Sequence, residues 1–138
     1  MTKLEDAIQA ARVAASSPPN PANARDAALV ILAAAAEDAR VIENLRDVRA
    51  GRALLRFTDT EEAIEFQAGD GRLHAEAADM KGKGPKVDAT SATWLGLFSG
   101  TLKPWLAFTR GMVVARAGLT ELRWLQQVAE SLQKAYEH

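Results

Sequence analysis

The sequence contains no cysteine among its 138 residues, which excludes disulfides, cysteine-ligated metals and thiol nucleophiles. Histidine is scarce as well, since only His74 and His138 are present. A catalytic or metal-binding histidine needs partners, and this inventory supplies no second internal histidine and no cysteine. We therefore interpret His74 as a structural residue on the water-facing side of a strand. We predict no bound metal, no cofactor and no enzymatic activity.

The sequence also lacks an excess of charge of one sign. It has 17 basic and 18 acidic residues, for a formal net charge of −1. Without a basic field, the composition argues against a nucleic-acid partner. The longest apolar run, residues 27–36, is about half of the roughly 20 residues that span a bilayer. The first residues lack the pattern of a secretory signal. We expect no transmembrane segment and a cytoplasmic location.

Prolines divide the chain near its beginning. Thr2 and Glu5 have the spacing of a capping box and predict a short helix. The segment Ser16–Pro21 contains three prolines and ends that helix. We predict two parts: an N-terminal helix with a Pro-rich linker over residues 1–21, and a single domain over residues 22–138.

Within the predicted domain the hydrophobic period changes from helical to alternating and back. A helix is expected over residues 22–46, followed by strands that alternate apolar and polar positions. The expected strands cover residues 53–57, 62–68, 72–77, 87–90 and 112–116. Three further helices are expected from Ser91 to Gly100, from Pro104 to Gly111 and from Leu119 onward. In the last of these, Gln133 is expected to face water with the other polar residues.

This order of elements predicts an α+β fold, in which a five-stranded, mainly antiparallel sheet is covered on one face by helices, with an extra N-terminal helix. Alternation gives the sheet one wet and one dry side. The dry side carries many small residues, such as Ala53, Ala68, Ala75, Ala77, Ala89 and Ala115.

Two polar segments have a functional and a structural interpretation. Asp59, Glu61 and Glu62 could hold a hard cation, but the cluster lacks the ligand alternation and the glycine of a calcium loop, so a solvated turn is the simpler interpretation. The segment Lys81–Lys86 has three lysines and two glycines. It lacks the Walker spacing, and it is either a cradle for a phosphate group or a flexible solvated loop.

The aromatic residues are concentrated near the end of the chain. Trp94, Trp105 and Trp124 all fall in the last third, together with Phe98 and Phe108. Large groups over a floor of alanines either pack tightly or leave a space for a ligand. The sequence does not choose between these outcomes.

A twelve-residue segment carries a family resemblance. The pattern Gly-x-Leu/Met-x-Pro-x-x-Ala-Phe-x-x-Gly is present as Gly100, Leu102, Pro104, Ala107, Phe108 and Gly111. With the strand and helix that follow it and the meander before it, the chain from Leu55 to Leu132 resembles the sterol carrier protein 2 domain, a family of small lipid-binding modules. The resemblance implies a hydrophobic tunnel between the sheet and the helices that takes sterols, fatty acids or acyl-CoA esters without chemistry.

We therefore predict a carrier of a hydrophobic small molecule (a fatty acid, a fatty acyl-CoA or a sterol-like lipid), with the C-terminal helix as its lid. The candidate ligand-binding residues are Leu55, Phe57, Phe66, Leu73, Val87, Trp94, Leu95, Phe98, Trp105, Phe108, Val113, Leu122, Leu125, Val128 and Leu132. The alternative is a dimerisation or protein-interaction module with a filled core and no ligand. A homodimer is compatible with both hypotheses.

Overall fold

The computed structural model describes residues 6, 9, 24–116 and 118–136. The elements in chain order are α2 (Ala24–Ala36), α3 (Ala39–Leu45), β1 (Gly51–Phe57), β2 (Glu62–Gly69), β3 (Arg72–Ala78), β4 (Lys86–Ala89), α4 (Ser91–Ser99), α5 (Pro104–Thr109), β5 (Val114–Ala115) and α6 (Leu119–Tyr136). The predicted caps of the N-terminal helix and the Pro-rich linker lie outside the described residues, so the division at residue 21 stays a prediction. Among the described helices, none is long and apolar enough to cross a membrane.

The five strands form one mixed sheet in the order β3-β2-β1-β4-β5. β1 pairs with β2, β2 with β3 and β4 with β5 in antiparallel fashion, while β1 and β4 run parallel. The predicted α+β class and the mainly antiparallel sheet are confirmed, with one parallel pairing in the centre. The β2–β3 hairpin turns at Asp70 and Gly71, which both have positive φ values of 52° and 73°, as a tight Asp-Gly turn requires.

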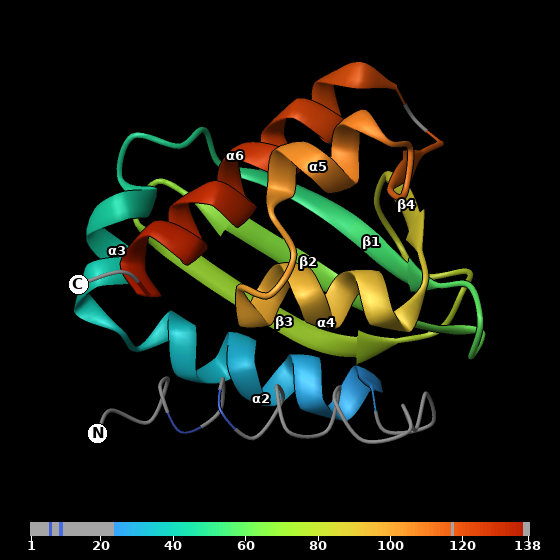
Figure 1. Cartoon of the computed structure of the whole chain (residues 1–138), viewed down its shortest axis with the longest axis horizontal. Helices are drawn as coiled ribbons and strands as arrows, with labels where there is room; N and C mark the ends of the chain where they lie inside the picture. Colours follow the sequence, from blue (N-terminus) through green and yellow to red (C-terminus); the bar gives the residue numbers. More distant parts are fainter. Residues whose placement is uncertain (1–5, 7–8, 10–23, 117, 137–138) are drawn as a thin grey trace.

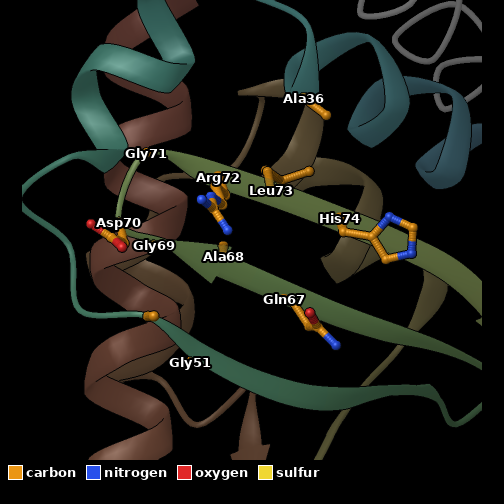
Figure 2. A pocket seen from close by; sticks show the side chains of 11 residues that line it. Ala36, Gly51, Gln67, Ala68, Gly69, Asp70, Gly71, Arg72, Leu73 and His74 are labelled. Carbon is orange, nitrogen blue, oxygen red and sulfur yellow. The ribbon is translucent and has the colours of Figure 1, made fainter.

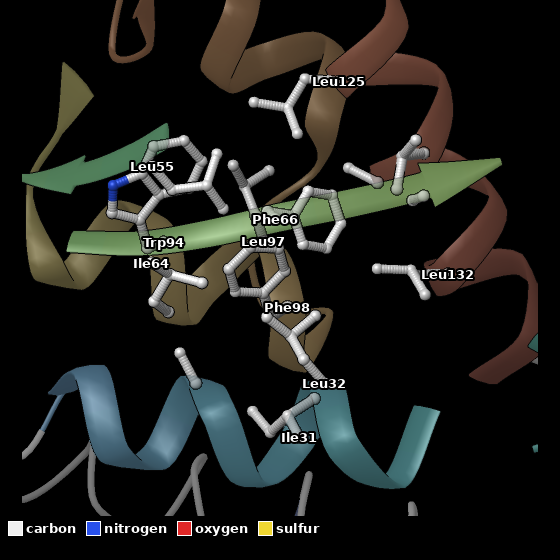
Figure 3. Close-up of a cluster of buried hydrophobic side chains, with 14 of the residues drawn as sticks. Ile31, Leu32, Leu55, Ile64, Phe66, Trp94, Leu97, Phe98, Leu125 and Leu132 are labelled. Atoms are coloured by element: carbon white, nitrogen blue, oxygen red, sulfur yellow. The ribbon is translucent and has the colours of Figure 1, made fainter. Parts of the chain in front are cut away.

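Helices cover one face of this sheet (Figure 1). α4, α5 and α6 lie over the strands, and α2 runs beside the edge strand β3. The face beneath them carries Leu55, Phe57, Ile64 and Phe66, all fully buried, because alternate residues of a strand point to the same side. Figure 3 shows side chains of this face meeting those of α2, α4 and α6 in one hydrophobic core.

The prediction of one long helix over residues 22–46 is wrong in one respect, because the structure has two helices there, α2 and α3. α2 ends at Ala36, and Asp38 caps α3 by accepting hydrogen bonds from the backbone N–H groups of Arg40 (2.9 Å) and Val41 (3.2 Å). A carboxylate at this position satisfies the first free N–H groups of a helix. The break turns Val41 and Leu45 inward, where both are fully buried. The fifth strand is also shorter than predicted and covers only Val114–Ala115.

Candidate functional site

The polar residues that the sequence singles out make separate contacts in the structure. His74 is exposed on β3, and its Nε2 atom lies 3.8 Å from the Glu76 carboxylate. Asp59 accepts hydrogen bonds from the backbone N–H and the hydroxyl of Ser91, while Glu62 forms an ion pair with Arg25 at 3.1 Å. Within the described part of the chain, no group of three acidic, histidine or cysteine side chains is placed to hold a metal ion.

The lysine-rich segment packs on the sheet, although Lys81 and Lys83 are exposed; whether it binds a phosphate group stays a prediction. It crosses the face opposite the helices, between β3 and β4. The N–H of Leu54 donates to the carbonyl of Pro85 at 2.8 Å, and the N–H of Lys83 donates to the Glu65 carboxylate at 3.3 Å. A Cβ on Gly82 would come within 2.9 Å of the Leu54 side chain. The segment thereby buries Leu54 completely on the side predicted to be wet.

Beneath this segment a buried carboxylate joins two arginines. Asp88 on β4 is 6% exposed. Arg56 on β1 donates to it through Nε and Nη2 (2.8 Å for the second contact), and Arg116 donates through Nε at 3.0 Å. Burial raises the pKa of Asp88, but the two arginines outweigh that effect and hold the pKa below its usual value. The hydrogen bond to Asp88 likewise raises the pKa of Arg56.

The apolar candidates do come together. Of the fifteen predicted ligand-binding residues, all but Trp105, Phe108 and Leu122 are buried in the core between sheet and helices. Phe108 and Leu122 are half-buried and pack against that core. Trp105 is 58% exposed, so its side chain lies at the surface and does not fill the interior. Ile31, Leu32, Ile64, Leu97 and Trp124 also belong to this core and were not among the candidates, although the alternation over residues 62–68 signalled Ile64 and the aromatic residues near the end of the chain include Trp124.

The aromatic side chains occupy the space over the sheet. Trp94 stacks on Phe98 with ring centroids 5.9 Å apart and planes 11° from parallel. Phe98 in turn lies 6.1 Å from Phe66, and Trp94 lies 6.3 Å from Phe57. The indole N–H of Trp94 donates to the carbonyl of Arg56 at 3.0 Å, which satisfies its polar atom in an apolar setting. These aromatic side chains occupy space between the sheet and the helices, and a guest in that volume would have to displace them.

Hydrogen bonds fasten the C-terminal half of α6. Gln133, predicted to face water, is instead 9% exposed. Its amide donates to the carbonyls of Leu97 (2.9 Å) and Leu102 (2.7 Å), and the Tyr136 hydroxyl donates to the carbonyl of Phe98 (2.7 Å). These carbonyls lie at and beyond the end of α4, where helix carbonyls lack partners within the helix. The predicted lid is therefore fixed at its C-terminal half.

We expect Gln133→Ala to lower the free energy of unfolding by about 1–3 kcal/mol, because two carbonyls near the end of α4 lose their donor. Gln126 on the same helix donates to Glu130 at the surface. Gln126→Ala is the matched control and should change stability by less than about 0.5 kcal/mol. Urea unfolding followed by circular dichroism measures both. Equal effects of the two substitutions would contradict the anchoring role of Gln133.

A depression of about 520 Å³ lies at the hairpin end of the sheet. Figure 2 shows Gln67, Arg72 and His74 around it, with Gly51 and the turn at Asp70 and Gly71 nearby. Its lining mixes exposed polar side chains and turn backbone with Leu73 and small residues. Ala68 and Leu73 of this lining also belong to the apolar core, whereas the aromatic side chains over the sheet do not line the depression.

Comparisons with known proteins identify the fold. No family model and no curated protein sequence matches the chain. Among solved structures, a crystal structure of sterol carrier protein 2 is similar with a TM-score of 0.55 and 20% identity, covering 84% of this chain and 93% of that one. A conserved hypothetical protein of Thermus thermophilus, described as possibly a sterol carrier protein, is similar with a TM-score of 0.51 and 20% identity. That match covers 69% of this chain and 73% of the other. The chain thus has the fold of sterol carrier protein 2, as the segment from Gly100 to Gly111 suggested.

Proposed function

We propose that this protein binds an extended apolar molecule, such as a fatty acid, an acyl-CoA or a sterol-like lipid, between its sheet and its helices and carries it without catalysis. The observation that supports the proposal most is the combination of a sterol carrier protein 2 fold with an interior built from apolar side chains of both layers. A cytoplasmic location and a homodimer remain predictions.

The geometry favours access to the interior beside α5 and the first half of α6. Phe108 and Leu122 are only half-buried there, and Leu119 at the start of α6 is exposed. Three side-chain hydrogen bonds from Gln133 and Tyr136 hold the C-terminal half of α6. The first half is held to the rest of the described fold by one, from the indole of Trp124 to the Arg49 carbonyl before β1. We propose that α5 and the first half of α6 move apart from the sheet to admit a chain.

A chain-length series of fatty acids tests this function. Burial of each further methylene group contributes about 0.8 kcal/mol, so affinity should rise steadily from short to long chains. At a concentration about 100-fold above Kd, a ligand adds about 2.7 kcal/mol to stability and should raise the melting temperature by several degrees. Coenzyme A without an acyl chain is the control and should cause no shift.

Native mass spectrometry of the same samples gives the second readout. A one-to-one complex with a fatty acid, an acyl-CoA or a sterol would support the proposal and identify the ligand class. A tight dimer that takes up none of these ligands, at concentrations far above micromolar, would contradict it and favour the protein-interaction module.

A further inference from the structure

Large exposed apolar side chains are concentrated in one short stretch of the chain. Among the described residues, Trp105 is 58% exposed, Met112 38%, Val114 46% and Leu119 66%. Only one other large apolar residue of the described part, Val30 on α2, is comparably exposed. Single exposed apolar residues are ordinary on a protein surface, but several together mark an interaction site.

These four residues come from neighbouring elements. Trp105 lies on α5, Met112 in the following turn, Val114 on β5 and Leu119 at the start of α6. Figure 1 shows α5, the turn to β5 and the beginning of α6 together at one end of the molecule, on the side away from α2. Contacts of α6 with both α5 and β5 hold these elements side by side. We call Trp105, Met112, Val114 and Leu119 the apolar corner.

The part of the sequence that contains the apolar corner is rich in positive charge. Residues 103–123 contain four basic residues and one acidic residue, whereas the rest of the chain contains thirteen basic and seventeen acidic ones. Arg116 is engaged by Asp88. Lys103, Arg110 and Arg123 are all exposed, at the start and the end of α5 and on the second turn of α6. A chain with a net negative charge therefore places three exposed basic residues on and beside the helices that carry Trp105 and Leu119.

We propose that the apolar corner is a docking surface for an anionic lipid bilayer. Tryptophan together with lysine and arginine is the composition that anchors proteins at the membrane interface, where an indole sits among the headgroups. Basic residues near an anionic bilayer attract it, and the attraction falls off within a Debye length. The corner would bring the half-buried side chains of α5 and α6 to the bilayer, although docking itself requires no ligand in the interior.

Vesicle binding tests the proposal. The probes are vesicles of phosphatidylcholine alone and of phosphatidylcholine with about one quarter phosphatidylserine, which supplies the anionic surface. We expect binding to the second kind, and we expect it to weaken as salt is raised from about 0.1 M to about 1 M, because the Debye length falls from about 10 Å to about 3 Å. Trp94 and Trp124 are buried, so Trp105 is the tryptophan whose emission should shift to the blue on binding.

Matched variants locate the surface. Trp105→Ala and Leu119→Ser should each weaken binding about tenfold, since each removes a large apolar group from the contact. Val30→Ser is the control, because it removes an equally exposed apolar residue from α2, and it should have no effect. Arg123→Gln should weaken binding about fivefold, which corresponds to about 1 kcal/mol for one basic residue near the surface. Lys134→Gln, on the same helix near its other end, should leave binding unchanged.

Three results would overturn the proposal. The first is the absence of binding to either kind of vesicle. The second is binding that the Trp105, Leu119 and Arg123 variants retain in full, which would assign docking to another surface. The third is a self-associating protein that Trp105→Ala converts to monomer in light scattering without any vesicle binding, which would make the corner a protein interface. All three can occur whether or not a fatty acid binds in the interior, so this test and that of the carrier function fail independently.

Discussion

Asp88→Ala is expected to lower the free energy of unfolding by about 3 kcal/mol, as loss of one partner from a buried ion pair does. Asp88 accepts hydrogen bonds from Arg56 and Arg116. Without it, the guanidinium of Arg56, whose side chain is only 18% exposed, keeps its charge without a carboxylate beside it. The value lies at the low end of the usual range of about 3–5 kcal/mol, because the guanidinium of Arg116 is exposed and can be hydrated when Asp88 is removed. Urea unfolding at neutral pH measures the loss.

A surface ion pair provides the matched control. Arg46 and Glu43 form a contact of similar length, 3.1 Å, between two exposed side chains on α3 and its end. Glu43→Ala should cost no more than about 0.5 kcal/mol, as exposed pairs usually do. If Asp88→Ala and Glu43→Ala have the same small effect, the Asp88 cluster is not a stabilising element.

The same cluster should make stability depend on pH in acid. Because the folded-state pKa of Asp88 is lower than the ordinary value, the unfolded state binds the proton first as pH falls. The contribution of Asp88 is therefore complete above its unfolded pKa of about 3.9, and it is lost as pH drops through the folded pKa. We expect the stability difference between the protein and Asp88→Asn to be constant near neutral pH and to shrink below about pH 4.

Most elements could be predicted because their signals are local. Alternation identified the meander, and the helix expected from Ser91 to Gly100 is found as α4, which Thr90 and Gly100 cap. The family pattern from Gly100 to Gly111 identified the fold for the same reason. Within twelve positions it combines a glycine that ends α4 in the left-handed conformation, a proline that begins α5 and a buried alanine at position 107.

The errors concern residues whose role depends on partners far away in the chain. Gln133 looks like a surface residue of an amphipathic helix, and only the placement of α4 gives its amide two carbonyls to bind. The contact of Gly82 with Leu54 was not predicted, because it depends on the crossing of the chain from β3 to β4. Trp105 looks like a core residue beside Leu106, yet which side of α5 faces inward depends on how α6 packs against it.

The packing of the interior also could not be predicted from local sequence signals. Large and small residues over one sheet face are evident in the sequence, but whether they fill the space is not. Trp94 decides this, because its ring reaches from α4 to β1, stacks on Phe98 and hydrogen-bonds to the carbonyl of Arg56. A ligand between sheet and helices competes with this indole for the same volume. If the protein is a carrier, replacing Trp94 should therefore change its affinity for a ligand, and this change can be measured.

Trp94→Ala is expected to lower the free energy of unfolding by about 3–5 kcal/mol, since it removes a fully buried aromatic side chain and leaves a cavity. It should also strengthen the binding of a long-chain fatty acid, because the acyl chain no longer has to displace the indole. The acyl chain can fill the cavity and gains dispersion contacts with its walls. Calorimetric titration with palmitate measures the affinity, and thermal unfolding with and without palmitate measures how much of the lost stability the ligand restores.

Leu54→Ala separates this effect from general loosening of the fold. Leu54 is also fully buried, but it lies on the opposite face of the sheet under Gly82. Its replacement should cost about 2–5 kcal/mol and leave palmitate affinity unchanged, because the cavity forms away from the proposed binding volume. Equal affinities of Trp94→Ala and the unaltered protein would place the ligand outside the space that the indole fills. Loss of palmitate binding in Trp94→Ala would instead make the indole part of the contact surface, with the ligand lying against it rather than in its place.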